Sequence, residues 1–395
     1  MQIYLVGGAV RDELLGIPSQ DRDWVVVGST AAALKRQGYQ QVGKAFPIFL
    51  DPNQREEYAL ATNAEQRWDA NITLTEDLQR RDLTLNAIAK TAQGEYVDPF
   101  NGRQDIADKI LRHVDDQSFQ RDPIRILRVA RLAARYHHLG FRVAADTTQL
   151  MQHMVNNGQL DHWVAERVWA EIEKALHTPH PDQFFLALRQ SHALKKIIPC
   201  LDRLFGVPQS PRSHPEVDTG IHSMLVLQQA CRLSNHGPVR WAALLHDVGK
   251  GATDQSLWPK HVGHEHSGET LVEALDQHLK TPKDYQQLSR MAARYHTEVH
   301  RLSELSADTI ITLLEQLDAF RRPKRFEQFL TVCLADCRGR SSYENAPYPQ
   351  KKTLMHWFQA LQQIDLKPTV QCCTDPSDIR AAVHQVRKQH LQRIM

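Results

Sequence analysis

Ile3-Tyr4-Leu5-Val6-Gly7-Gly8, followed thirteen residues later by Asp21-Arg22-Asp23-Trp24, decides the fold. Ile3–Val6 predicts a short buried strand, and the glycine pair allows the backbone to turn close to a ligand. Ala9–Leu15 predicts a helix whose free N–H groups would face an anion such as a phosphate. A second strand is expected at Trp24–Val27. Asp21 and Asp23 stand two apart at its start, so both carboxylates would point to one face.

Two carboxylates beside a phosphate-binding turn suit nucleotidyl transfer with two Mg²⁺ ions. The ions activate an attacking hydroxyl and neutralise charge on the phosphorus and the leaving pyrophosphate. Asp21 and Asp23 are therefore the predicted catalytic residues and Mg²⁺ ligands. The alternative is a plain turn followed by a solvated strand end, because motifs this short recur by chance.

Bulk properties bound the class of protein. With 395 residues the chain is long enough for two or more domains. Its 48 Lys+Arg against 46 Asp+Glu leave it nearly neutral, so any nucleic-acid contact must come from local basic faces. The six cysteines have no zinc or disulfide spacing. No leader pattern and no apolar run of about 18 residues is present, which predicts a cytoplasmic protein without a membrane partner.

The predicted fold class is α+β. Strand patterns end early in the chain, and helical periodicity dominates from about Pro123 onward. Breakers mark a boundary near 206–216 and a linker at Tyr343–Pro349. The predicted division is an α/β head at 1–115, a helical neck at 116–205, a helical module at 206–342 and a helical tail at 343–395.

Arginines in the head and neck suggest a polyphosphate site. Arg81 precedes a helix predicted at Leu83–Ala89 and could clamp a triphosphate, or be a surface charge near a helix start. After Asp122, a predicted N-cap, and Pro123, a helix is expected whose arginines recur at three- and four-residue steps. These are Arg125, Arg128, Arg131 and Arg135. They form one cationic stripe, which polyphosphate binding explains better than a solvated face.

Two further pairs in the neck could act on a bound nucleotide. Asp122 offers an acceptor and Arg125 a forked donor, a combination able to hydrogen-bond a base edge. Arg167 and Glu171 are four apart on a helix, where they could orient the neck residues or form an ordinary ion pair.

The motifs, in this order, resemble those of class II tRNA nucleotidyltransferases, the CCA-adding enzymes of the polymerase β-like superfamily. They are Gly7-Gly8-Ala9-Val10-Arg11-Asp12, Asp21-x-Asp23, Arg80–Ala87 and Asp122-Pro123-Ile124-Arg125. The resemblance spans the whole chain and is closest to the long bacterial form. It implies a polymerase β-like head, Mg²⁺ on Asp21 and Asp23, and nucleotide contacts. The implied contact residues are Gly8, Arg11, Arg81, Arg128 and Arg131, with Asp122 and Arg125 reading the base.

The chain departs from that family pattern at two places. Arg121 stands where a Glu is usual. The strand ending at Ala61 is normally followed by Arg-Thr-Glu and a flexible loop, but residues 61–76 are about ten residues short here. Whether Glu65 replaces the acidic residue of that segment is open.

A spaced His/Asp series marks the second module. His246-Asp247 lies at the end of an apolar run before Gly249-Lys250, and a buried vicinal His-Asp is a poor core choice unless it binds metal. Imidazole and carboxylate ligands suit a transition metal that activates water. The module resembles HD phosphohydrolases, which implies a metal set of His222, His246, Asp247 and Asp336, with His264 and His296 auxiliary. Ni²⁺ is the expected ion, with Co²⁺ or Mn²⁺ as alternatives.

Three functions are compatible with the sequence. The first is addition of C, C and A to tRNA 3′ ends from CTP and ATP, with phosphatase, 2′-nucleotidase and 2′,3′-cyclic phosphodiesterase activity in the second module. The second is a poly(A) polymerase of the same superfamily. The third is an RNA-end phosphohydrolase whose head is inactive. The expected partners are the tRNA acceptor arm and 3′ end, ATP and CTP, with the chain a monomer or homodimer.

Overall fold

A computed structural model describes residues 1–19, 22–42, 48–52, 56–63, 65, 67–372 and 375–395. The chain forms two compact units. One comprises 1–171 and 183–193, and the other comprises 172–182 and 194–395. Each unit is described by itself.

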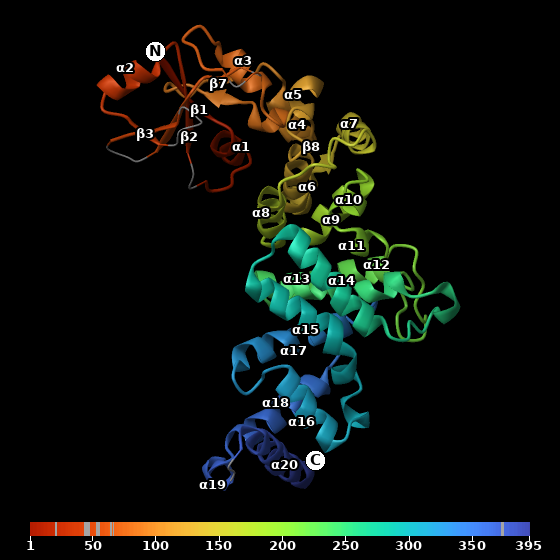
Figure 1. Ribbon diagram of the computed structural model, residues 1–395. Coiled ribbons are helices and arrows are strands. Elements are labelled where there is room, and N and C mark those ends of the chain that lie inside the picture. The colour runs from red at the N-terminus through yellow and green to blue at the C-terminus, as the bar shows by residue number, and fades with distance from the viewer. Residues whose placement is uncertain (20–21, 43–47, 53–55, 64, 66, 373–374) are drawn as a thin grey trace. The chain divides into compact units, whose positions relative to one another are not determined.

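In the described part of the first unit, seven strands form one mixed sheet in the order β3-β4-β5-β2-β1-β6-β7 (red to orange in Figure 1). β2 and β5 are parallel, and the other neighbours are antiparallel. The strands are β1 (Gln2–Val6), β2 (Asp23–Val27), β3 (Gln40–Val42), β4 (Ile48–Leu50), β5 (Glu57–Leu60), β6 (Ala89–Lys90) and β7 (Tyr96–Val97). The strands predicted at Ile3–Val6 and Trp24–Val27 are confirmed. The β-rich run Pro47-Ile48-Phe49-Leu50 predicts a further strand; its described part is β4, and Pro47 lies outside the described residues.

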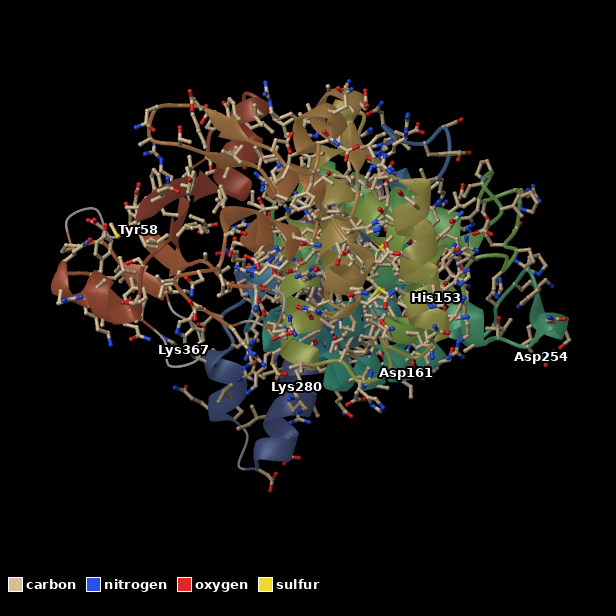
Figure 2. The ribbon with its side chains drawn as sticks, turned by 90° about the horizontal axis from the view of Figure 1, so that it is seen from above. Tyr58, His153, Asp161, Asp254, Lys280 and Lys367 are labelled. Carbon is tan, nitrogen blue, oxygen red and sulfur yellow. The ribbon has the colours of Figure 1, made fainter. Side chains whose placement is uncertain are left out.

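Alternation along β2 explains why its two faces pack against different cores. Val25 packs with Val6 and Ala89 on one face. Val26 packs with Tyr58 on the other, where Trp24 and Tyr58 stack with ring centroids 5.8 Å apart. Tyr58 is marked in Figure 2. The period-2 pattern therefore fixes the face on which Asp23 lies.

Short helices and a small second sheet complete this unit. The parallel strands β8 (Ile110–Leu111) and β9 (Arg142–Val143) pair with each other. The helices are α1 (Gly8–Leu14), α2 (Ala31–Arg36), α3 (Leu74–Gln79), α4 (Gly102–Asp108), α5 (Asp116–Gln120), α6 (Arg125–Tyr136), α7 (Ala145–Asn156), α8 (Ala165–Leu176) and α9 (Pro181–Gln190), the last two crossing the unit boundary. The α1 prediction is confirmed within one residue.

The prediction of a helix at Leu83–Ala89 is wrong. The chain there makes one 3-10 turn at Thr84–Asn86 and then enters β6. Leu83 bridges to His113, and Ala89 pairs with Val6 and Val97. A short apolar run does not distinguish a helix from a buried strand, and pairing within the sheet decides it here.

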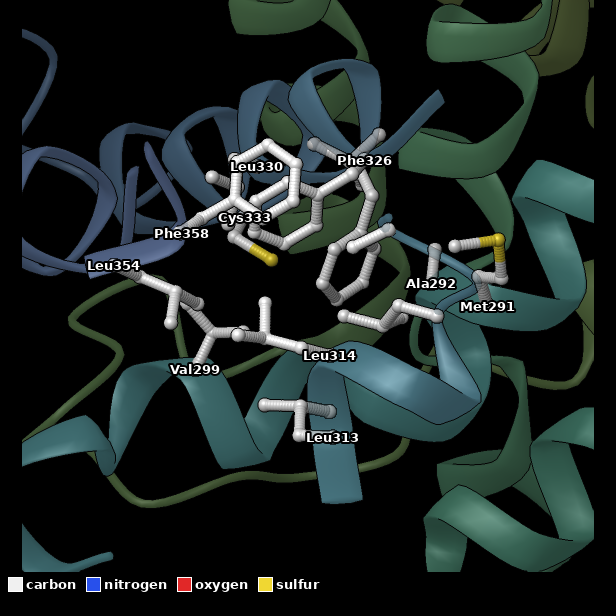
Figure 3. Packing of buried hydrophobic residues seen from close by; sticks show 14 of the residues in the cluster. Met291, Ala292, Val299, Leu313, Leu314, Phe326, Leu330, Cys333, Leu354 and Phe358 are labelled. Carbon is white, nitrogen blue, oxygen red and sulfur yellow. The ribbon is translucent and has the colours of Figure 1, made fainter. Parts of the chain in front are cut away.

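The second unit is helical in its described residues. Its helices are α10 (Leu194–Ile197), α11 (Pro199–Asp202), α12 (Thr219–Leu233), α13 (Gly237–Leu245), α14 (His264–Leu279), α15 (Lys283–His300), α16 (Ala307–Gln316), α17 (Pro323–Arg338), α18 (Pro349–Gln362), α19 (Lys367–Gln371) and α20 (Pro376–Ile394). Figure 3 shows a core in which Phe326 and Cys333 of α17 pack with Phe358 of α18. Among the described helices, none is long and apolar enough to cross a membrane.

Candidate functional site

A cavity of about 350 Å³ in the first unit collects most of the residues predicted for the nucleotide site. The predicted residues lining it are Gly8, Arg11, Asp23, Arg81, Arg125, Arg128 and Arg131. Gly7, Arg80, Asp82, Asn86 and Leu132 line it as well. Asp122 is not among the described lining residues, and Asp21 lies outside the described part of the chain. The cavity is strongly cationic, because six arginines line it. They come from three separate segments and are Arg11, Arg80, Arg81, Arg125, Arg128 and Arg131.

The first glycine is required by both conformation and space. Gly7 has φ +71°, and a Cβ added there would lie 3.0 Å from Nη1 of Arg81. Any larger residue would therefore strain the turn and push Arg81 away from the cavity. Gly8, the first residue of α1, leaves room for the Arg11 guanidinium, whose Nη2 would lie 3.4 Å from a Cβ.

Asp23 begins β2 and is exposed. In the parallel register of β2 and β5 it is opposite Glu57, which is also exposed. Residues opposite each other in a sheet point to the same face, so the two carboxylates share one side. Sequence reasoning missed Glu57, because strand register is not visible in one segment alone.

The arginines predicted to form a cationic stripe on α6 all have partners in the structure. Arg125 donates to the carbonyl oxygens of Arg81 and Arg80 at 3.1 and 2.5 Å. The other three pair with carboxylates from distant segments. These pairs are Arg128–Asp82 at 2.9 Å, Arg131–Glu171 at 2.6 Å and Arg135–Asp12 at 2.9 Å. Repulsion along the stripe is thus relieved by carboxylates far away in the sequence.

Buried polar groups support the cavity from behind. Asn86 accepts from Nη1 of Arg11 at 2.6 Å and donates to Asp82 at 2.8 Å. Burial would raise the pKa of Asp82, but Arg128 and the Asn86 hydrogen bond outweigh it and hold the pKa below its usual value. Asp82 therefore stays ionised and fixes Arg128 at the wall of the cavity.

Arg167 contacts Asp122. Its Nη2 lies 2.7 Å from Oδ2 of Asp122, while Glu171 contacts Arg131. Arg167 and Glu171 thus pair with other neck residues, and an ion pair between the two is not among the described contacts; that they orient the neck residues stays a prediction. The prediction that Asp122 is the N-cap of α6 is wrong. The N-cap is Ile124, without a side-chain cap, because the Asp122 carboxylate is turned toward Arg167.

Asp77 of α3 links the short 61–76 segment to the cavity. Its Oδ1 accepts from the backbone N–H of Thr62 at 3.1 Å, and its Oδ2 lies 3.1 Å from Nη2 of Arg81. The side chain is fully buried. Burial raises its pKa, but Arg81 and Arg80 outweigh this and hold the pKa below the usual value. The carboxylate of Glu65, in contrast, lies 3.2 Å from the exposed Arg67, which is its one described partner, and its backbone N–H donates to Asn63.

If the nucleotides expected from the sequence resemblance, CTP and ATP, are the substrates, Asp77→Asn is expected to raise their KM about three- to tenfold and to change kcat less. Asn keeps the size of the side chain but removes the charge that holds Arg81. Steady-state kinetics with each nucleotide measures the effect. Glu65→Gln, in the same segment but exposed, is the matched control and should behave as wild type. An unchanged KM in Asp77→Asn would contradict the link.

The second unit brings the predicted His/Asp series together. Nδ1 of His246, His264 and His296 each makes a hydrogen bond, whereas Nδ1 of His222 lies close to a carboxylate without hydrogen-bond geometry; in all four imidazoles Nε2 is turned inward. The Nδ1 partners are Glu216 Oε1 for His222 (2.8 Å), Ala243 O for His246 (2.8 Å), His261 O for His264 (2.9 Å) and Ala292 O for His296 (2.8 Å). The three carbonyl acceptors fix, in their imidazoles, the tautomer that leaves an Nε2 lone pair for a ligand.

The two aspartates stand among these nitrogens. Asp247 Oδ2 lies 3.2 Å from His246 Nε2, and its Oδ1 lies 3.4 Å from Nε2 of His264 and of His296. Asp336 Oδ1 lies 3.1 Å from His222 Nε2. The ligand atoms fall into overlapping groups within 4.8 Å.

Buried orphan atoms show that these residues fit a metal. His246 Nε2, His264 Nε2 and Asp247 Oδ1 are buried and have no hydrogen-bond partner in the described part of the chain. Such atoms are costly unless something binds them. Burial raises the pKa of Asp247, but Lys250 and His246 outweigh it and hold the pKa well below its usual value. The site thus offers imidazole nitrogens and an ionised carboxylate, the donors that a divalent transition metal takes.

Sequence reasoning missed several neighbours of this site. Lys250, quoted in the motif without a role, lies 2.6 Å from Oδ2 of Asp247. Glu216 holds His222, His214 stacks edge-on against it, and His300 contacts Asp336. The motif His-Asp-x-Gly-Lys could have pointed to Lys250, but the others lie in loops and helix ends without any spacing signal.

Family models match three parts of the chain. A Poly A polymerase head domain matches residues 3–112, and a probable RNA and SrmB-binding site of polymerase A matches 140–205. An HD domain matches 219–322.

Curated relatives match nearly the whole chain. The multifunctional CCA protein of Teredinibacter turnerae is 48% identical over 402 residues, covering 99% of this chain and 98% of the relative. That of Nitrosococcus oceani is 53% identical over 380 residues, covering 94% and 93%. The chain belongs to the multifunctional CCA protein family. It is therefore an enzyme of the CCA nucleotidyltransferase type that also carries an HD domain, and the predicted resemblance is confirmed.

Solved structures of CCA-adding enzymes share the fold. The Bacillus stearothermophilus enzyme in complex with CTP has a TM-score of 0.69 at 20% identity, covering 99% of this chain and 89% of that one. The Thermotoga maritima enzyme complexed with tRNA has a TM-score of 0.65 at 18% identity, covering 99% and 87%. The α+β prediction, with a nucleotidyltransferase head and a helical HD module, is confirmed. The boundaries predicted at 115, 205 and 342 stay predictions.

Proposed function

We propose that the first unit adds C, C and A to tRNA 3′ ends from CTP and ATP, reading each base with protein side chains. The observation that supports this most is the arginine-rich cavity with Asp23 at its edge. Its cationic wall suits a triphosphate, and its relatives are CCA proteins. CCA addition is preferred over poly(A) synthesis, because the relatives that match nearly the whole chain are named multifunctional CCA proteins.

Asp21 and Asp23 are the residues that would hold Mg²⁺, which when bound supplies charge neutralisation at the transferred phosphorus. The remaining work falls to side chains on the cavity wall. Arg81 and Arg128, each held by a buried aspartate, bind the triphosphate oxygens. Arg11 and Gly8 contact the nucleotide beside the β1–α1 turn.

The proposal is tested by incubating the protein with tRNA lacking CCA, tRNA ending in CC and an unstructured RNA, each with one labelled nucleotide at a time. C should enter the first substrate and A the second, while the unstructured RNA stays unextended. Long A-tails would support the poly(A) polymerase alternative instead. No incorporation at all would support an inactive head.

Asp122→Ala is expected to weaken discrimination of C from U and of A from G about ten- to a hundredfold. In our proposal Asp122, oriented by Arg167, is the acceptor for the exocyclic amino group of the incoming base. Misincorporation is measured with UTP and GTP. The affinity for tRNA serves as the control and should be unchanged, since in the proposal Asp122 contacts the incoming base and not the tRNA. Unchanged discrimination would remove the base-reading role.

We further propose that the second unit is a metal-dependent phosphohydrolase. His222, His246, Asp247 and Asp336 would hold a transition metal, Ni²⁺ in first place, with His264 and His296 auxiliary. A bound ion of this kind lowers the pKa of water for attack on a phosphate ester. The inward Nε2 atoms and the orphaned Oδ1 of Asp247 support the assignment.

The substrates proposed for this site are phosphate monoesters, 2′-nucleotides and 2′,3′-cyclic phosphates. Hydrolysis of each is measured after chelation, with Ni²⁺, Co²⁺, Mn²⁺ or Mg²⁺ restored. Imidazole ligands predict that a transition metal restores activity better than Mg²⁺. If Mg²⁺ alone restored it fully, or if chelation had no effect, the transition-metal assignment would be wrong.

A further inference from the structure

The two oxygens of Asp336 face opposite ways. Oδ1 points to the inward nitrogens, 3.1 Å from His222 Nε2 and 3.7 Å from His246 Nε2. Oδ2 points outward and lies 2.5 Å from Nε2 of His300, the last residue of α15. Asp336 is therefore held on its outer side by a residue outside the His/Asp series.

His300 is held in turn by Tyr348. The Tyr348 hydroxyl lies 2.9 Å from Nδ1 of His300, and the two rings meet edge-on at 5.5 Å. A carboxylate only accepts, so Nε2 of His300 carries the hydrogen toward Asp336. In a neutral ring Nδ1 then accepts, and the tyrosine O–H donates to it. The three residues form one directed chain of hydrogen bonds ending at Asp336.

Tyr348 comes from a segment that sequence analysis assigns to the tail. It lies between α17 and α18 and is 9% exposed. Its ring belongs to the apolar core shown in part in Figure 3, with Phe358 and Leu354. The Tyr348 ring therefore packs in the apolar core, while its hydroxyl contacts His300.

We propose that His300 and Tyr348 are positioning residues of the phosphohydrolase site, holding Asp336 in the orientation that presents Oδ1 to the metal. The inference rests on the proposed function, in which Asp336 is a metal ligand. A carboxylate fixed through its outer oxygen loses less freedom on binding an ion, which is why outer partners strengthen metal sites. In this proposal the metal site of the HD domain also depends on Tyr348, which lies beyond residues 219–322 matched by the HD family model.

The test measures metal affinity rather than activity. Chelator-treated full-length protein is titrated with Ni²⁺ or Mn²⁺ by calorimetry, and binding that persists in Asp247→Ala is subtracted as belonging elsewhere. Tyr348→Phe keeps the ring and removes only the hydroxyl, so Kd should rise several-fold. His300→Ala should raise Kd about ten- to a hundredfold, and His300→Gln, which can donate from Nε2, should recover part of it.

Tyr343→Phe is the matched control, because Tyr343 lies in the same segment but is 45% exposed. It should bind metal as wild type does, and CCA addition should stay normal in all four proteins. Wild-type Kd in both Tyr348→Phe and His300→Ala would overturn this inference alone. If Asp247→Ala bound the metal as tightly as the wild type does, the proposed metal site and the inference would both fail.

Discussion

Asp23→Ala is expected to lower the rate of nucleotide addition at least about a thousandfold, the largest effect in the first unit. Asp23 stands at the start of β2 on the face that borders the arginine-lined cavity. Its carboxylate is the described member of the proposed Mg²⁺ pair, and no other described carboxylate lines that cavity except the buried Asp82. Asp82 is already paired with Arg128 and cannot replace it.

The measurement is single-turnover addition of C to tRNA lacking CCA. Hydrolysis of 2′,3′-cyclic phosphate by the same preparation is the control for folding, and it should be unchanged because the two sites lie in separate compact units. Addition at near wild-type rate would contradict the two-metal proposal.

Asp247→Ala is expected to abolish hydrolysis of cyclic phosphates and phosphate monoesters, to below about a thousandth of the wild-type rate. Asp247 is the one carboxylate in the described part of the site that contacts His246, His264 and His296 together. Its loss removes a proposed metal ligand and leaves the Lys250 ammonium buried without its anion. CCA addition should remain.

Asp254→Asn is the matched control for this variant. Asp254, marked in Figure 2, follows the same segment in the chain and is exposed, and the contacts described for its carboxylate are with Ser256 alone. It should keep both activities. Equal hydrolysis by Asp247→Ala and wild type would mean that the His/Asp series is structural.

The predictable parts of the fold are those carried by short local patterns. The strand at Ile3–Val6 and the glycine turn follow from period and backbone freedom within a few residues. The His/Asp series of the second unit was visible because six residues of metal-ligand type recur in a helical context. Their convergence on one centre then follows from helix packing alone.

The parts that could not be predicted depend on contacts between distant segments. Asp77 and Asn86 look like ordinary polar residues in the sequence, yet each holds an arginine of the cavity wall. The local pattern of Leu83–Ala89 predicts a helix, but pairing of Ala89 with β1 places that residue in a strand. The N-cap prediction for Asp122 failed for the same reason, since Arg167 lies 45 residues away in the sequence.

The same limit applies to the second site. His300 and Tyr348 are 48 residues apart, and nothing in either local pattern links them to Asp336. With 21 histidines in the chain, composition cannot select the one that supports a ligand. Only the fold shows that its ring lies against the outer oxygen.

The most direct test of the account is to sequence the 3′ ends of tRNA lacking CCA after incubation with all four nucleoside triphosphates and Mg²⁺. Competition between nucleotides leaves the choice of base entirely to the protein. We predict that the ends are C, CC and CCA, with CCA dominant at long times and no further extension. Ends carrying U, G or A-tails, or no extended ends at all, would contradict the proposal that this short-loop head is a complete CCA-adding enzyme.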